Sequence, residues 1–292
     1  MSSRPGLAVA PITSDPVPVL TIDDSWRTAF HGTIPIDTTI LITKDAPFSK
    51  CRDIIAKLKH LTRFTLKETV NPNDKPTLND ILEILKNDPE LKRVVIKINN
   101  EHEVESKFES RIELNKLEML WLSVNRWKDA KYIISRIRIP EKKETEMVIS
   151  CCPEAVDLND ALKSLNGFAS SPVRMQLNFT GRNGPTIQLV GEKGTLTLIN
   201  ISNTHAQTVL VRRSPLALKK IEHLQLEFDN SELPGSPDPS LFPALDTMVT
   251  SGLRDRKGEL VLPVEIRKFI DFLKMETIEV NQERSYFRFK IS

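Results

Sequence analysis

The spacing of the apolar residues constrains the fold of this chain more than any other feature of its sequence. In LNKLEMLWLSV, residues 114–124, the leucines at 114, 117, 120 and 122 are three, three and then two positions apart. A helix face would continue in steps of three or four residues, and a strand in steps of two. The first spacing therefore indicates a turn or helix end that points inward. The closing L-x-L predicts a short strand with alternate side chains in the core.

The same spacing recurs at LKHLTRFTLKE, DPELKRVVIKI and LKKIEHLQLEF. The last apolar strand positions of five successive units are Ile42, Leu66, Ile96, Leu122 and Val148. The steps between them are 24, 30, 26 and 26 residues, close to the roughly 20 to 29 residues of leucine-rich repeats. The spacing therefore predicts an α/β fold, a leucine-rich-repeat solenoid with parallel strands on one face and helices on the other.

Helix-spaced apolar residues lie between these strands, in SKCRDIIAKLKHL, TLNDILEILKNDPEL and DAKYIISRI. Ser49, Thr77 and Asp129 are the predicted N-caps, because their side-chain oxygens can accept the free amides of a first turn. A doubly wound α/β domain alternates the same elements and is the alternative. The recurrence of one apolar spacing before several strands, without a Gly-rich phosphate loop after the first strand, favours the repeat.

Two segments depart from the repeat. Residues 1–20 are rich in proline and lack periodicity, so we expect a disordered lead followed by one leucine-rich-repeat-like domain over 21–292. Residues 173–202 hold three alternating runs separated by turn residues, which predict an antiparallel meander inserted into the solenoid. The closing residues predict a helix over 264–274 and two strands, METIEV and YFRFKI.

Composition argues against several classes of protein. Lys plus Arg number 41 and Asp plus Glu 39, a formal net charge of +2, so no nucleic-acid partner is expected. The longest apolar runs are strand-sized, and prolines stand where a signal peptide needs an apolar core, so no membrane partner is expected. Three cysteines without C-x-x-C spacing fit a reducing compartment, the cytoplasm or nucleus.

No arrangement of residues in the sequence predicts catalysis. The five histidines are scattered without an H-x-x-x-H pair, and the cysteines lack ligand spacing, so no metal site is expected. The sequence GEKG at 191–194 lacks the Ser or Thr of a phosphate loop and predicts a tight turn. Cys151 and Cys152 have no basic neighbour in sequence that would activate a thiol. We therefore expect no enzymatic activity and no cofactor.

The order of these segments resembles the leucine-rich region of the F-box proteins expanded in mushroom-forming fungi. The resemblance rests on LNDILEILKNDPELKRVVIKIN, IELNKLEMLWLSV and DAKYIISRIRIP, and then on LQLEFDN, SLFPALDTMV, SGLRDRKGE and VEIRKFIDFLKMETIEV, and covers residues 39 to 281. It implies a protein-binding leucine-rich-repeat module similar to the substrate-receptor part of an F-box protein, with a protein partner of unknown identity. The alternative is a free-standing scaffold or inhibitor with no ubiquitin-ligase link.

The F-box that such proteins carry before their repeats has no counterpart in the sequence before Ile40. We therefore expect this chain not to hold the Skp-type adaptor of cullin ligases.

The side chains between the buried strand positions predict where a partner binds. If Leu120 and Leu122 point into the core, Trp121 and Ser123 face outward, because side chains alternate along a strand. The same alternation predicts two rows of outward residues, spaced by about 4.8 Å between strands: Thr65, Val95 and Trp121 in one row, and Lys67, Lys97 and Ser123 in the next. Trp121 is the expected anchor, since aromatic residues supply much of the energy at interface centres. The alternative is that a loop or the N-terminal lead covers it.

Overall fold

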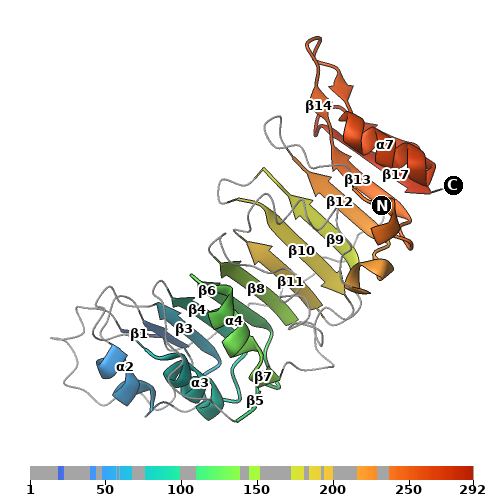
Figure 1. The fold of residues 1–292 in the computed structure, drawn as a ribbon. Helices are drawn as coiled ribbons and strands as arrows, with labels where there is room; N and C mark the ends of the chain where they lie inside the picture. The colour runs from blue at the N-terminus through green and yellow to red at the C-terminus, as the bar shows by residue number, and fades with distance from the viewer. Residues whose placement is uncertain are drawn as a thin grey trace, which may run out of the picture.

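The computed structural model describes residues 19–22, 40–43, 48–56, 58, 60–67, 76–98, 110–138, 145–151, 172–180, 184–191, 194–199, 216–228 and 237–291 (Figure 1). Thirteen of the strands in these ranges form one sheet, in the order β1-β2-β3-β4-β6-β8-β11-β10-β9-β12-β13-β17-β16.

The first six strands of this sheet are all parallel to their neighbours. They are β1 (Val19–Ile22), β2 (Ile40–Thr43), β3 (Arg63–Lys67), β4 (Arg93–Ile98), β6 (Met119–Val124) and β8 (Thr145–Cys151). The five predicted strand centres fall in β2, β3, β4, β6 and β8 and follow one another in chain order. The apolar spacing does not predict β1, which begins at Val19 within the proline-rich segment. Residues 1–18 of that segment lie outside the described ranges.

The remaining seven strands mix both directions. They are β9 (Pro172–Asn178), β10 (Thr186–Gly191), β11 (Gly194–Ile199), β12 (His223–Glu227), β13 (Thr247–Ser251), β16 (Met275–Asn281) and β17 (Tyr286–Ile291). The meander β9-β10-β11 is antiparallel within itself, but β11 joins β8 in parallel and β9 joins β12 in parallel. β13 pairs with β12 in parallel, and β17 is antiparallel to both β13 and β16.

Two small sheets lie outside the large one. β5 (Ile112–Glu113) pairs in parallel with β7 (Ile137–Arg138), and β14 (Leu253–Arg254) pairs antiparallel with β15 (Leu260–Val261).

The prediction of a leucine-rich-repeat solenoid is therefore wrong. The strands form one mixed sheet, parallel and antiparallel, and the segment over 173–202 is a continuous part of that sheet and not an insertion that interrupts a solenoid. The physical reason lies in what the spacing measures. An L-x-L pattern reports that one strand face is buried, and a step of 24 to 30 residues separates successive strands, but neither fixes the direction in which later strands pair.

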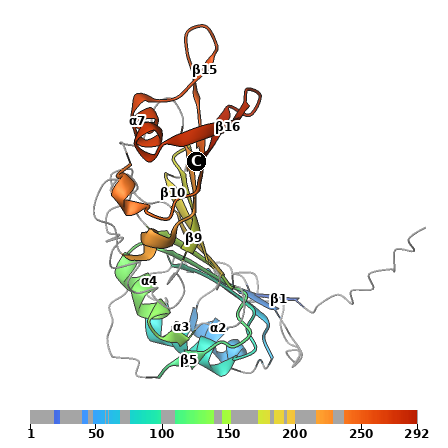
Figure 2. The ribbon, with the colours of Figure 1, turned by 90° about the vertical axis from the view of Figure 1, so that its right-hand side faces the viewer.

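The helices lie together on one face of the large sheet. They are α2 (Phe48–Ile55), α3 (Leu78–Asn87), α4 (Trp127–Ile134) and α7 (Val264–Leu273), with 3₁₀ helices η2 (Leu216–Lys220) and η3 (Pro239–Leu241). Figure 2 shows them on the same side of the sheet when it is viewed near its edge. No helix of the described ranges covers the other side, which we call the open face.

Among the described residues, one buried cluster runs along the helical face of the sheet from β3 to β17. Leu66, Ile96 and Leu122 belong to it at the parallel end, as do Leu226 and Phe289 at the mixed end. Strands such as β4, β6 and β12 contribute alternate side chains to this cluster, as a strand with one buried face must. The other side chains of the same strands stand on the open face.

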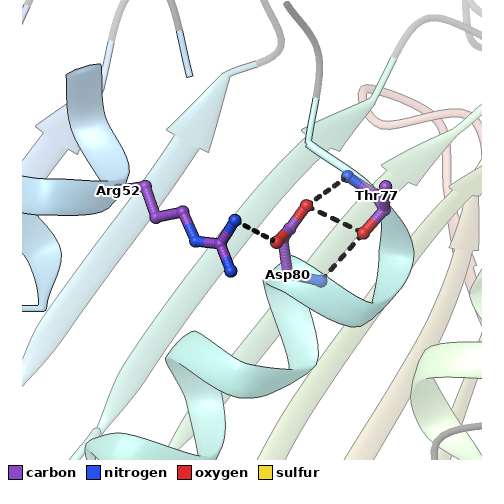
Figure 3. A network of polar contacts seen from close by, with 3 residues as sticks. All are labelled: Arg52, Thr77 and Asp80. Carbon is purple, nitrogen blue, oxygen red and sulfur yellow. Dashed lines mark hydrogen bonds and ion pairs between the residues drawn. The ribbon is translucent and has the colours of Figure 1, made fainter. Parts of the chain in front are cut away.

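A capping box starts α3, as the N-cap prediction at Thr77 requires (Figure 3). The Asp80 amide donates to Thr77 Oγ1 over 3.1 Å, and the Thr77 amide donates to Asp80 Oδ2 over 3.0 Å. Arg52 of α2 reaches Asp80 Oδ1 at 3.6 Å and joins the two helices.

The other two N-cap predictions are wrong. α2 already begins at Phe48, so Ser49 lies inside its first turn. The N-cap of α4 is Arg126, whose guanidinium donates to both carboxylate oxygens of the buried Asp129 over 3.0 Å.

Candidate functional site

The alternation along β3, β4 and β6 gives the open face its side chains. Phe64, Val94 and Leu120 are fully buried on the helical face, whereas the residues between buried positions are half-buried or exposed. The strand register then aligns the outward residues across the three strands.

Both predicted rows are present in the register. Thr65 is aligned with Val95, and Val95 with Trp121. The second row is equally aligned, Lys67 with Lys97 and Lys97 with Ser123. The structure therefore brings all six predicted residues together on the open face. Whether they bind a partner stays a prediction.

A third row, which the sequence analysis did not single out, lies on the other side of Trp121. It aligns Arg63 with Arg93 and Arg93 with Met119. Arg63 and Arg93 stand four positions before Lys67 and Lys97, so the two-residue alternation already predicts them on this face. We call Arg63, Lys67, Arg93 and Lys97 the basic array. All four side chains are exposed.

Trp121 lies at the border of the basic array. It is aligned with Val95 on one side and with Val148 on the other, and it is half-buried. Lys97 Nζ lies 5.7 Å from the centroid of its ring, within the range of a cation–π contact. The indole Nε1 is buried and has no hydrogen-bond partner. A buried N–H without an acceptor is uncommon in a folded protein and requires a reason.

The electrostatics of the basic array are unbalanced. Arg63 is aligned with Arg93, and Lys67 with Lys97, so like charges stand directly opposite each other twice. Within the described ranges, Arg63, Arg93 and Lys97 form no ion pair. Like charges at opposed positions of neighbouring strands are destabilising. Glu146, aligned with Met119, limits the positive surface on the β8 side.

A second polar region of the open face lies over β9 and β12. Glu227 accepts hydrogen bonds from the side-chain amides of Gln176 (3.2 Å), Asn178 (2.6 Å) and Gln225 (2.6 Å). We call these four residues the Glu227 network. Polar residues alternate visibly in VRMQLN and HLQLE, but the network could not be predicted from the sequence, because its members meet only through the pairing of β9 with β12.

A hollow of about 480 Å³ opens beside this network. Gln188, Gln176, Gln225, Val249 and Arg288 are aligned across its floor. Most of these polar groups bind one another: besides the Glu227 network, Gln188 donates to Thr197 over 3.4 Å and Arg288 pairs with Glu279 at 3.3 Å. Most of the polar groups on the floor of the hollow therefore already have partners on the same face, whereas Arg174, which also lines it, is exposed.

Titratable groups give no catalytic arrangement in the described ranges. Burial raises the pKa of Asp88, at the end of α3, to about 6, although the Leu61 amide and His60 oppose that shift. The hydrogen bond that Tyr286 donates to Glu279 raises the pKa of that phenol. Tyr286 is aligned with Ser251, but the Ser251 hydroxyl donates to the main-chain carbonyl of Phe228 over 3.1 Å. No group of three or more potential metal ligands and no helix able to span a bilayer occurs among the described residues.

Comparison of the chain with protein-family models, with curated proteins and with solved structures gave no match in any of the three. The resemblance to F-box proteins, the absence of enzymatic activity and the cytoplasmic or nuclear location therefore stay predictions.

Proposed function

We propose that this chain is a protein-binding module whose docking surface is the open face of β3, β4 and β6 around Trp121. The observation that carries the proposal is the strand register, which sets an aromatic side chain and lysines in adjoining rows on a face that no described helix covers. Tryptophan is among the residues from which interface anchors are commonly made, and the lysines beside it add a charge that can select the partner.

The rigidity of the surface supports the same function. Thr65, Val95 and Trp121 each stand between two buried neighbours, as Trp121 does between Leu120 and Leu122. Its main chain is also paired on both sides, with β4 and with β8. A docking surface fixed in this way loses little conformational entropy on binding. Such a rigid docking surface would suit a substrate receptor and a free-standing scaffold or inhibitor equally.

Site-specific photocrosslinking in cells of the source organism tests the proposal. A benzophenone amino acid replaces Ser123, on the open face, or Lys128, an exposed residue of α4 on the helical face. We expect one discrete protein adduct from position 123 that is absent from position 128. Adducts of equal yield from both positions, or from position 128 alone, would contradict the assignment of the face.

The adduct should depend on Trp121. Trp121→Ala, combined with the crosslinker at 123, is expected to abolish it, because truncating an interface anchor costs about 2 kcal/mol or more of binding energy. Arg174→Ala, an exposed position of the same face on β9, is the matched control and should leave the adduct unchanged. Circular dichroism and the melting temperature establish that each variant is folded.

A further inference from the structure

We infer that the partner of this surface presents an acidic segment, which sets carboxylates against the basic array and an apolar side chain against Trp121. This inference rests on the proposed function, because it assigns the chemistry of the partner to the same face. It is carried by three observations: the sign of the aligned charges, the place of the Trp121 ring beside them and the limits of the positive surface.

The sign of aligned charges distinguishes the basic array from the rest of the described strands. Elsewhere, charged residues that face each other across two strands are opposite in sign. These pairs are Glu113 with Arg138, Glu276 with Lys290, and Glu279 with Arg288. Glu113 with Arg138 and Glu279 with Arg288 are ion pairs at 3.3 Å. Only β3 and β4 set like charges opposite each other, twice in five aligned positions.

Such a repulsion is relieved when anions from another molecule lie between the cations. A carboxylate placed between Arg63 and Arg93 faces two guanidinium groups, each of which offers a planar fork of donors to its two oxygens. A second carboxylate between Lys67 and Lys97 meets two ammonium groups. The two pairs are four positions apart along each strand, a distance of about 13 Å, which an extended acidic segment can span.

Trp121 adds an aromatic ring beside the charged rows. Its Nε1 is buried, so a bound segment meets the ring and not the N–H. Lys97 Nζ lies 5.7 Å from the centroid of that ring. The ring itself, beside Val95 and Val148, offers an apolar contact next to the charged rows.

The limits of the positive surface favour a protein segment over a nucleic acid. The basic array is two strands wide, and Met119 and Glu146 follow Arg93 in the same row. Surfaces that bind a phosphate backbone are more extended in positive charge and raise the net charge of their domain, whereas this chain has a formal net charge of only +2. A short acidic stretch with an apolar neighbour fits the observed dimensions.

Fluorescence anisotropy with defined probes tests the inference on the full chain. The probes are labelled peptides of about twelve residues, whose extended length is about 40 Å, with Leu at every second position. The positions between carry Glu in the first peptide, Gln in the second and Lys in the third. A single-stranded RNA and a DNA duplex of similar length complete the set.

We expect the Glu peptide to bind at least about tenfold more tightly than the Gln peptide, and less tightly as salt rises from about 50 to about 200 mM. Arg63→Glu with Arg93→Glu should abolish this preference and create binding of the Lys peptide, whereas Arg174→Glu on β9 should change neither. An unlabelled Glu peptide should also suppress the adduct at position 123.

Equal or absent binding of the Glu and Gln peptides overturns the acidic segment, while a persisting adduct at position 123 leaves the docking face intact. Tighter binding of RNA or DNA than of the Glu peptide overturns the acidic segment in favour of a nucleic acid. If no position-specific adduct forms at position 123 in the absence of any added peptide, the result counts against the protein-docking function itself, whether or not the peptides bind.

Discussion

The polar side chains at the two ends of the open face are paired in opposite ways. At the mixed end, Glu227 accepts hydrogen bonds from three amide side chains, and Arg288 pairs with Glu279. At the parallel end, Arg63 faces Arg93 and Lys67 faces Lys97. Both surfaces are polar, and both stand on strands of one sheet with one buried cluster behind them.

The difference teaches which polar surface is structural and which is available to a partner. Side chains that satisfy one another contribute to the stability of the fold, and a ligand must break their hydrogen bonds to bind them. Like charges held opposite each other, such as Arg63 and Arg93, repel each other, and an anionic partner placed between them relieves that repulsion. Sites for function are often retained at a cost in stability, and the basic array fits that description better than the hollow beside Glu227 does.

The largest effect on stability is expected from the buried cluster that lies behind both ends of the open face. Leu122→Ala and Leu226→Ala remove fully buried side chains from the same cluster at opposite ends. Each should reduce the free energy of unfolding by about 2 to 5 kcal/mol, measured by urea denaturation. An unchanged melting temperature for either variant would contradict its burial, and a large loss at one end alone would break the picture of a continuous core.

The Glu227 network should give the next largest effect. Glu227→Ala leaves three amide donors without their shared acceptor, and we expect a loss of about 1 to 3 kcal/mol, since hydrogen bonds to charged groups are stronger than average. Glu222→Ala, at an exposed position just before β12, is the matched control and should stay within about 0.5 kcal/mol of the parent. Equal stability of the two variants would remove the structural role of the network.

The residues of the open face could be predicted from the sequence at the parallel end only. Alternation in RFTLK, RVVIKI and MLWLSV places Thr65, Val95 and Trp121 on one face, and the parallel pairing of successive strands aligns them in one row. These inferences use positions within a strand and between successive parallel strands. They are local enough for periodicity to determine them.

The mixed end could not be predicted in the same way. β11 lies beside β8, although β9 and β10 come first in the chain, and Gln176 meets Glu227 across 51 residues of sequence. No short-range pattern encodes which strands become neighbours after a meander. Arg63 and Arg93 are different, because alternation along β3 and β4 already places them on the open face, so they could have been predicted from the sequence together with Lys67 and Lys97.

A smaller effect is expected from the helical layer behind the basic array. The pKa of Asp88 is raised from 3.8 to about 6, with burial as the main cause. The folded state therefore holds a proton more strongly than the unfolded state does. Protonation of Asp88 therefore adds to the free energy of unfolding. This stabilisation is fully present below the pKa of the unfolded state and is lost as the pH rises through the pKa of the folded state.

Asp88→Asn should therefore raise the melting temperature by about 1 to 4 °C at about pH 8, where the parent carboxylate is charged, and change it little at about pH 4. Differential scanning calorimetry across this range gives the comparison. A stabilisation of equal size at both pH values would show that the carboxyl charge is not its cause.

The smallest expected change is also the sharpest test of the comparison, because its sign is opposite to that at Glu227. Arg93→Glu replaces a like-charge pair with an opposite-charge pair facing Arg63 on the open face. We expect the free energy of unfolding to rise by about 0.2 to 1 kcal/mol at low salt. The gain should disappear at about 1 M salt, where the screening length falls to about 3 Å.

Arg174→Glu is the control for adding a negative charge to the same face, at a position that faces His223 and Val190. Its effect on the free energy of unfolding should be near zero. If Arg93→Glu destabilises the chain at low salt, the array is not strained by its own charge, and an acidic partner would no longer be needed to explain it.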